Sequence, residues 1–324
     1  MLLTHTPDMR ANYYGARALA DLRSLADVLL HEGASALSPA DLIAAAQDVD
    51  LIIADRLTTG PAEIFESLPR LKAFLRCAVD IRNIDVAAAS KAGVLVTRAK
   101  PGFVESVTEL TLGFLVDLAR GVSRATASYQ SGRFPEIRVG RQLAGSSLGI
   151  IGYGAIALHL APVGAALGMT VLISDPHVRV DDMRFRQVPF ETLLAEADHV
   201  VCLAVATDAT ENLMDAQAFG RMKHDAVFIN VSRGNLVDEA ALTAALRNGT
   251  IAGAAMDVGR ALDQMPTMAV AALPNIVATP HIGGLTRPAI EAQALDTVEQ
   301  VRELVGGAVP HGAVNAGRWT RGAQ

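Results

Sequence analysis

The feature that most constrains the fold is residues 148–157, Leu-Gly-Ile-Ile-Gly-Tyr-Gly-Ala-Ile-Ala. An apolar run is followed by two glycines one residue apart and then by a helix-like segment. Gly152 permits a sharp turn, Gly154 lets an anion approach the backbone, and Ala157 is small enough for close packing of helix on strand. The free N–H groups at the start of the helix attract negative charge. The segment predicts a strand–turn–helix unit that holds a phosphate group.

A second apolar run, residues 170–173, follows the helix and leads to Asp175 and Pro176. An acid about 20 residues beyond a glycine turn of this kind binds the ribose hydroxyls of a dinucleotide. Glycine turns also occur for steric reasons, but Asp175 favours nucleotide binding. Its negative charge would repel a 2′-phosphate, so we expect NAD rather than NADP.

Short apolar runs alternate with helix-like runs along the whole chain, and Gly or Pro often separates them. This alternation of strand-like and helix-like segments predicts an α/β fold with parallel sheets covered by helices on both faces. We expect a helix capped by Ser38 with Pro39 in its first turn, and a continuous helix over residues 104–129. The longer helix is apolar on more than one face, so it is buried in the fold or against another subunit. Further helices are expected over residues 83–92, 238–248 and 287–305, and strands over residues 50–54, 73–77, 94–96, 148–151, 170–173, 197–204, 226–231, 251–258 and 276–281.

Composition narrows the class of protein. Hydrophobic residues make up 51% of the 324 residues and charged residues 19%, with a net charge of −6 and no long basic run. A large core is therefore expected, and nucleic acid is not an expected partner. Cys77 and Cys202 lie in apolar runs, which suggests the reducing cytoplasm rather than a disulfide scaffold. The N-terminus lacks the pattern of a signal peptide, and glycines interrupt the charge-free residues 142–174, so no membrane association is expected.

Polar side chains follow several of the expected strands. Because ligands collect outside the carboxyl ends of parallel strands, these positions are candidates for a site. Arg233 could grip a carboxylate with two hydrogen bonds, although an arginine here could also be a surface residue. His281, with Gly283 and Gly284 beside it, could act as an acid or base, or could be a solvated loop residue.

Four motifs together carry a resemblance to a known family. They are Gly152-x-Gly154-x-x-Ala157, residues 230–239 (Asn-Val-Ser-Arg-Gly-Asn-Leu-Val-Asp-Glu), residues 253–258 (Gly-Ala-Ala-Met-Asp-Val) and residues 279–284 (Thr-Pro-His-Ile-Gly-Gly). The chain resembles the D-isomer-specific 2-hydroxyacid dehydrogenases, as a divergent member similar to phosphoglycerate dehydrogenases and glyoxylate or hydroxypyruvate reductases.

The resemblance implies two Rossmann-like or flavodoxin-like parallel-sheet domains. The NAD-binding domain, residues 99–284, would be inserted in a substrate domain of residues 1–98 plus 285–324. The chain would interconvert a 2-oxo acid and a D-2-hydroxy acid with NAD, and would pair as a homodimer through the helix after Pro101. No metal is implied.

Residue roles follow from the same resemblance. Arg233 would hold the substrate carboxylate and carbonyl oxygen, His281 would give a proton to that oxygen as hydride arrives, and Asp257 would lie near the nicotinamide. Substrate contacts are expected from Ala78, Val79, Asp80 and Arg233. Cofactor contacts are expected from Gly152, Tyr153, Gly154, Ala155, Ile156, Asp175, Pro176, Ala204, Val205, Thr210, Val231, Ser232, Asp257, Gly283 and Gly284.

Three departures from the family pattern matter. Leu262 stands where the family has a glutamate that pairs with the histidine matched by His281. Asp263 or Gln264, the next residues along the chain, could replace that glutamate. Asp263 is therefore a further catalytic candidate. Residues 77–80, Cys-Ala-Val-Asp, replace a glycine-rich turn that binds the substrate carboxylate. In the strand after Asp198, Ala204 and Ala206 stand at the positions where the family usually has a histidine and a proline.

Asp80 then places a negative charge where an anion is expected. Either Arg82 neutralises it, or the substrate carries a hydroxyl or amino group there, or Asp80 points away and caps the next helix. The missing glutamate also leaves a rival interpretation open: an NAD(H)-binding regulatory protein of the corepressor type with little or no turnover. Gln264 alone suggests a third, an activity similar to formate dehydrogenase.

Overall fold

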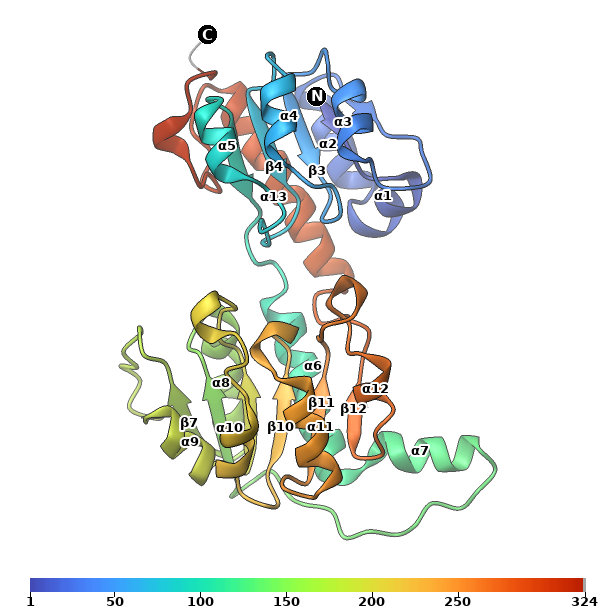
Figure 1. Ribbon diagram of the computed structural model, residues 1–324, viewed down its shortest axis with the longest axis vertical. Helices are drawn as coiled ribbons and strands as arrows, with labels where there is room; N and C mark the ends of the chain where they lie inside the picture. The colour runs from blue at the N-terminus through green and yellow to red at the C-terminus, as the bar shows by residue number, and fades with distance from the viewer. Residues whose placement is uncertain (323–324) are drawn as a thin grey trace. The chain divides into compact units, whose positions relative to one another are not determined.

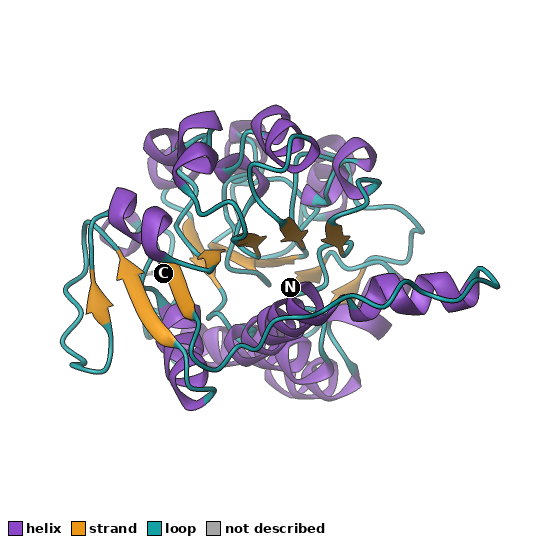
Figure 2. Ribbon diagram, turned by 90° about the horizontal axis from the view of Figure 1, so that it is seen from below, coloured by secondary structure: helices purple, strands orange, loops and turns teal. Residues whose placement is uncertain are grey.

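The computed structural model describes residues 1–322 of the chain, which divides into two compact units (Figure 1). Unit 1 comprises Met1–Gly102 and Arg287–Gln324, and unit 2 comprises Phe103–Thr286. The second unit is thus inserted into the first. Both units are built on parallel sheets with helices on either side of the strands (Figure 2), so the predicted α/β fold is confirmed.

Unit 1 contains a five-stranded sheet in the order β2-β1-β3-β4-β5, in which every pair is parallel. Its helix α3 begins as the sequence predicts, with Pro39 in its first turn and the Ser38 hydroxyl accepting a hydrogen bond from the Asp41 N–H. The strands are β1 (Leu2–Leu3), β2 (Leu29–Leu30), β3 (Leu51–Ala54), β4 (Ala73–Arg76) and β5 (Leu95–Arg98). The helices are α1 (Pro7–Tyr13), α2 (Ala16–Leu25), α3 (Pro39–Ala45), α4 (Ala62–Ser67), α5 (Val86–Lys91) and α13 (Arg287–Val305).

Unit 2 contains a seven-stranded parallel sheet in the order β12-β11-β10-β9-β6-β7-β8. Its strands are β6 (Ser147–Ile151), β7 (Thr170–Ser174), β8 (Arg186–Gln187), β9 (His199–Cys202), β10 (Val227–Asn230), β11 (Gly253–Met256) and β12 (Ile276–Ala278). The helices are α6 (Val104–Arg120), α7 (Val122–Gln130), α8 (Ala155–Ala166), α9 (Phe190–Glu196), α10 (Ala216–Arg221), α11 (Glu239–Arg247) and α12 (Met268–Ala271).

The core of unit 2 lies on both faces of the sheet. Neighbouring residues of β10 enter different clusters: Phe228 packs with Leu242 of α11, whereas Ile229 packs in a cluster with Leu160 of α8. The strands are therefore apolar at nearly every position, as strands covered on both faces must be. This explains why their sequences read as continuous hydrophobic runs.

The predicted helix over residues 104–129 is wrong in one respect. Gly121 adopts a left-handed conformation with φ of 68° and separates α6 from α7. Glycine takes this conformation without a Cβ clash, so it ends the first helix although the helical pattern continues. None of the residues in α7 is buried. The predicted helix over residues 83–92 is also shorter, because α5 starts only after its N-cap, Asp85.

No helix in the described part of the chain is long and apolar enough to cross a membrane.

Candidate active site

The glycine turn lies where the strand order of unit 2 reverses. The chain runs from β6 outward to β7 and β8, then returns to β9 on the other side of β6, which is where open α/β sheets bind ligands. Gly152, with φ of 91°, follows β6 at this point. A Cβ there would lie 2.8 Å from the Ala204 backbone, which follows β9. Only glycine fits, so the turn is fixed both by conformation and by contact.

Gly154 leaves room for an anion at the start of α8. No atom lies within 4 Å of the place where its Cβ would be, and both Gly154 and Ala155 are exposed. Gly154 is the N-cap residue of α8, and no side chain caps the helix. The free N–H groups of the first turn therefore face open space, as a site for a pyrophosphate requires. Ile156 is half-buried and Ala157 is buried against the sheet.

Asp175 follows β7 and connects two segments of this edge. Its carboxylate accepts hydrogen bonds from the Tyr153 N–H (2.8 Å) and from the N–H groups of His177 (2.8 Å) and Val178 (3.0 Å). Burial opposes ionisation of Asp175, but these donors outweigh it and hold its pKa below the usual value. The residue is a carboxylate at neutral pH, next to the turn that would hold the pyrophosphate. Pro176 follows it.

The segment after β9 supplies the next candidates. The Ala204 carbonyl accepts a hydrogen bond from the Ser232 hydroxyl (2.7 Å), which ties this segment to the end of β10. The Thr210 hydroxyl donates to the Val205 carbonyl (2.7 Å), while the Val205 side chain is exposed. Val231 is buried. Thus Ala204, Val205 and Ser232 form one connected rim of the sheet.

Arg233 lies in a turn that the Asn230 side chain holds from both sides. The Asn230 amide donates to the Arg233 carbonyl (2.9 Å), and its oxygen accepts from the Ser232 N–H (3.0 Å). The backbone after Arg233 passes so close to Gly259 that a Cβ on Gly234 would overlap it. Arg233 itself is half-buried and donates to the Ser232 carbonyl at 2.7 Å. The guanidinium is therefore presented from a firmly held backbone.

Asp257, after β11, holds the loop that carries His281. It is 2% exposed, and its carboxylate accepts bonds from the Thr279 hydroxyl (2.6 Å) and the N–H groups of Ile282 (2.8 Å) and Gly283 (2.8 Å). Its carbonyl accepts a bond from the His281 N–H (2.9 Å). Asp257 thus contacts the segment 279–283 at four points. Gly284 follows that segment.

His281 is oriented by a main-chain carbonyl. Its Nδ1 lies 2.8 Å from the carbonyl oxygen of Asp263. Leu262, at the position expected for the family's glutamate, is 86% exposed. The loop therefore brings the residue after Leu262 to the ring, and the contact is made by backbone rather than by a carboxylate.

Three residues here have backbone conformations that side chains disfavour. Asp263, Gln264 and His281 have φ values of 55°, 58° and 55°. Such conformations in non-glycine residues cost on the order of 1–3 kcal/mol each and cluster at functional sites. Asn212 is the one other non-glycine residue with positive φ in the described chain. The strain is thus concentrated at the contact between His281 and Asp263.

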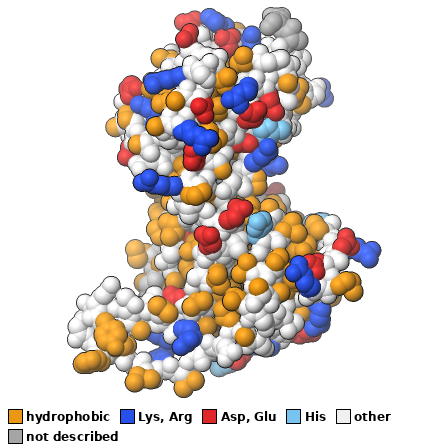
Figure 3. All heavy atoms as spheres, turned by 180° about the vertical axis from the view of Figure 1, so that it is seen from behind, with side chains coloured by type: hydrophobic (Ala, Val, Ile, Leu, Met, Phe, Trp, Pro, Cys, Tyr) orange, Lys and Arg blue, Asp and Glu red, His pale blue; other side chains and the backbone are white. Residues whose placement is uncertain are grey.

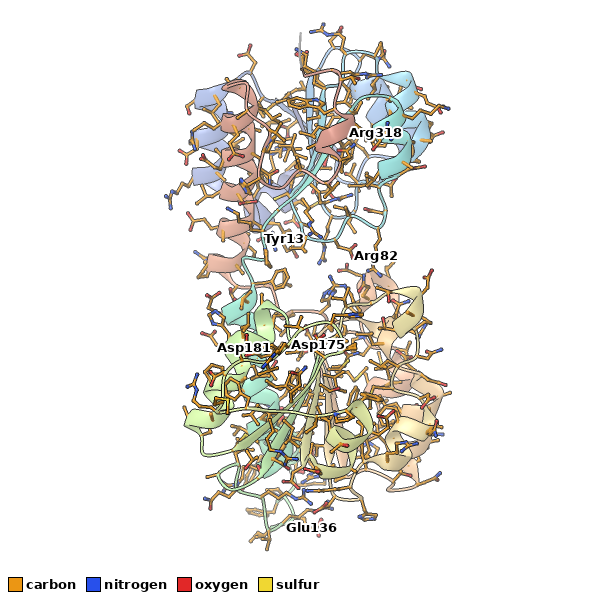
Figure 4. The ribbon with its side chains drawn as sticks, turned by 90° about the vertical axis from the view of Figure 1, so that its left-hand side faces the viewer. Tyr13, Arg82, Glu136, Asp175, Asp181 and Arg318 are labelled. Atoms are coloured by element: carbon orange, nitrogen blue, oxygen red, sulfur yellow. The ribbon has the colours of Figure 1, made fainter. Side chains whose placement is uncertain are left out.

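The candidate substrate loop of unit 1 follows β4. Ala78 and Val79 lead to Asp80, whose carboxylate pairs with Arg82 through contacts to Nε (3.0 and 3.1 Å) and Nη2 (2.6 Å). Of the alternatives for Asp80, the structure shows pairing with Arg82; α5 is capped by Asp85 instead. Figure 4 shows Arg82 at the same end of unit 1 as Tyr13.

Sequence reasoning assigned no role to Asn230 or Thr279. Both belong to the motifs already quoted, but their function is to hold Arg233 and Asp257 through side-chain hydrogen bonds. No local pattern indicates such contacts, because each joins segments that only the folded sheet brings together.

Comparisons with known proteins show the family to which the chain belongs. Residues 112–283 match the family model for the D-isomer specific 2-hydroxyacid dehydrogenase, NAD binding domain. A D-3-phosphoglycerate dehydrogenase of Synechocystis is 32% identical over 91% of this chain and 53% of its own length, so the chain spans about half of that relative. A hydroxypyruvate reductase of Thermotoga maritima is 30% identical over 80% of this chain and 86% of its own.

A solved structure, the TT0316 protein from Thermus thermophilus, has the same fold. It superimposes with a TM-score of 0.87 at 30% identity and covers 97% of this chain and 99% of its own. The match thus includes both units. With its glycine turn, the acid that follows β7 and the family motifs, this chain belongs to the D-isomer-specific 2-hydroxyacid dehydrogenases, a family of NAD-dependent oxidoreductases.

Proposed function

We propose that this protein reduces a 2-oxo acid to a D-2-hydroxy acid with NADH, and catalyses the reverse reaction with NAD⁺. The observation that carries the proposal is the arrangement at one edge of unit 2. Arg233, after β10, and His281, after β12, lie on the edge that also holds the glycine turn and Asp175. A carboxylate-binding cation and a proton donor beside a dinucleotide site are what this reaction needs.

Bound NADH supplies the hydride that is added to the carbon of the 2-oxo group. Arg233 binds the substrate carboxylate through its planar guanidinium and so orients the neighbouring carbonyl. The Nδ1–H of His281 donates to the Asp263 carbonyl, which leaves Nε2 to deliver a proton to the carbonyl oxygen. In the reverse direction the same nitrogen removes the hydroxyl proton.

For the substrate, we propose a small 2-oxo acid with no charge beyond its carboxylate, such as glyoxylate or hydroxypyruvate. Because Arg82 pairs with Asp80 in a two-pronged contact, the loop after β4 presents a neutralised pair rather than an unpaired negative charge. A hydroxyl group can hydrogen-bond to such a pair. The relative named hydroxypyruvate reductase is in line with this choice.

A panel of 2-oxo acids with NADH, followed by absorbance at 340 nm, tests the proposed function. We expect turnover of glyoxylate or hydroxypyruvate and slower turnover of acids with a second carboxylate. Tight NADH binding without turnover of any acid would contradict the proposal and favour the regulatory interpretation.

We expect NADH to bind at least about tenfold more tightly than NADPH, because the Asp175 carboxylate accepts bonds from a ribose hydroxyl and repels a 2′-phosphate. In Asp175→Ala the two affinities should approach each other. Fluorescence titration of both reduced cofactors measures this, with Asp181→Ala as the matched control for an exposed acid nearby. Equal affinities in the wild type would refute the assignment of Asp175.

We also propose that the protein is a homodimer formed through α6, α7 and the segment after α7. None of the residues in α7 is buried, and the apolar side chains of Phe134, Ile137 and Val139 are 93–102% exposed. A groove of about 710 Å³ between α6 and α7 has Leu112, Val116 and Val122 in its wall. Hydrophobic atoms are visible along this projecting part of unit 2 in Figure 3. An exposed apolar surface next to an apolar groove suits a second copy of the same chain.

The double variant Phe134→Ser, Ile137→Ser should be monomeric, because it removes apolar contacts from an interface that would bury about 800 Å² per partner. Light scattering after gel filtration gives the mass, and Val305→Ser, an exposed position on α13, is the control. A wild-type mass of one chain at micromolar concentration would rule out the dimer.

A cytoplasmic location is also proposed. Cys77 and Cys202 are both free and buried, and burial raises the pKa of each thiol to about 12. Neutral thiols of this kind are typical of proteins in a reducing compartment.

A further inference from the structure

A second polar cavity lies at the opposite edge of the sheet in unit 2. It has a volume of about 190 Å³ and is bounded by the end of α6, the start of α7 and the first residues of β9 to β12. Its wall includes Arg120, Arg124, Arg138, Arg141, His199 and Asp225. His199, Val227, Gly253 and Ile276 begin their strands, so this is the amino edge, whereas the glycine turn and Asp175 lie at the carboxyl edge. In Figure 4, Glu136, two residues from Arg138, and Asp175 lie at opposite ends of the unit.

The wall of the cavity carries more positive than negative charge. Arg141 pairs with Asp225 (2.6 Å), and Arg138 pairs with Glu136 (2.6 Å). In the described chain, neither Arg120 nor Arg124 has a carboxylate within 4.0 Å. Asp117 also lies in the wall, so its carboxylates are those of Asp117 and Asp225 against four guanidinium groups, and neither Arg120 nor Arg124 forms an ion pair with a described residue. Like charges gathered in one hollow are stabilised by an anion.

His199 gives the second, independent indication of a ligand. The residue is 1% exposed, and among the described residues neither ring nitrogen has a hydrogen-bond partner. A buried polar atom without a partner costs about 1–3 kcal/mol, so such groups are ordinarily satisfied. Burial lowers the pKa of His199, and the neighbouring Arg141 lowers it further against the effect of Asp198. The neutral ring offers one N–H donor to a ligand in the cavity.

The start of α7 borders the same wall but is already occupied by a carboxylate of the chain. The Asp117 carboxylate accepts a hydrogen bond from the Ser123 N–H at 2.8 Å, next to the N-cap residue Gly121. This negative charge offsets the positive end of the helix dipole, so the attraction for an anion comes from the arginines and His199.

We propose that this cavity binds a small polyanion, a metabolite that carries a phosphate or two to three carboxylates, between Arg120, Arg124 and His199. Guanidinium groups bind phosphate and carboxylate oxygens in pairs, and the cavity volume admits a molecule of this size. The site is separate from the dinucleotide edge, so the bound anion is an effector or structural ligand rather than a substrate. The proposal does not depend on the reaction proposed above. Val139 and Ser123 belong both to the wall of this cavity and to the surface proposed for the second copy, so the cavity borders that surface.

Isothermal titration of the NAD-saturated protein with inorganic phosphate and, separately, with citrate tests the proposal. Saturation with NAD prevents the probes from occupying the pyrophosphate site. We expect one equivalent of phosphate or citrate per chain, and a loss of about tenfold or more in affinity for each of Arg120→Ala and Arg124→Ala. Tighter binding of one probe identifies the phosphate or carboxylate class. Arg247→Ala, an exposed arginine at the end of α11, is the matched control and should bind as the wild type does.

The imidazole NMR signals of His199 can be measured in the wild-type protein. This test therefore does not depend on whether a variant folds. The signals should shift on saturation with the better probe, and His199→Gln should weaken its binding. The proposal is overturned if neither probe binds the NAD-saturated protein, if the Arg120→Ala, Arg124→Ala double variant binds unchanged, or if the His199 signals do not move.

Discussion

Arg233→Ala is expected to lower kcat/KM for the best 2-oxo acid by about a thousandfold, because it removes the group that binds the substrate carboxylate. Arg233→Lys should lose less, since lysine keeps the charge, but still about tenfold or more because it lacks the planar two-bond fork. NADH affinity should change little in either variant. Steady-state kinetics with the 2-oxo acid panel measure these effects.

Arg221→Ala, at the end of α10, is a control for loss of an arginine elsewhere in unit 2. Near-wild-type kcat/KM in Arg233→Ala would show that Arg233 does not bind the carboxylate.

His281→Ala should reduce kcat for reduction by about 10²–10⁴-fold, the usual contribution of a positioned acid or base. The affinity for NADH should change little, because His281 acts on the substrate. Steady-state rates of reduction with the 2-oxo acid panel, together with titration of NADH, check both expectations.

Asp263→Asn separates the backbone contact from the side chain. Because Nδ1 of His281 contacts the Asp263 carbonyl, the substitution leaves that hydrogen bond in place, so the variant should keep more activity than His281→Ala. His224→Ala, an exposed histidine, is the control. A His281→Ala variant with near-wild-type kcat would mean that another group supplies the proton.

Much of the fold could be predicted because it depends on local chemistry. The strands of unit 2 are covered on both faces, so they read as apolar runs, and the turn at Gly152 requires a residue without a Cβ. Since all strands are parallel, polar residues that follow them lie at one edge. This is why Asp175, Arg233 and His281 could be proposed together from sequence.

The sequence offers Asp263 as a partner of His281, but it could not show that the contact is made by the main-chain carbonyl of Asp263. Counting from Asp257 places Leu262 in the position of the family's glutamate, but positive φ values at Asp263 and Gln264 change the course of the loop. Neither residue type signals such a conformation as glycine does. The hydrogen bond to a main-chain carbonyl carries no sequence signature at all.

The break at Gly121 could not be predicted for a related reason. Hydrophobic residues continue at helical spacing beyond it, so the pattern favours one helix over residues 104–129. In the structure α7 buries none of its residues. Its apolar side chains cannot be explained by contacts within the described chain, and the proposed second copy would supply them.

Transfer of deuterium to the product from NADH that carries deuterium at both C4 positions tests the central claim most directly. Incubation with the best 2-oxo acid, followed by mass spectrometry and chiral chromatography, identifies the atom and the face that receive the hydride. For hydroxypyruvate or another acid with a chiral product, we predict one deuterium on the hydroxyl-bearing carbon and the D enantiomer alone. An L or racemic product, or no deuterium in any acid although NADH is bound, would contradict the account.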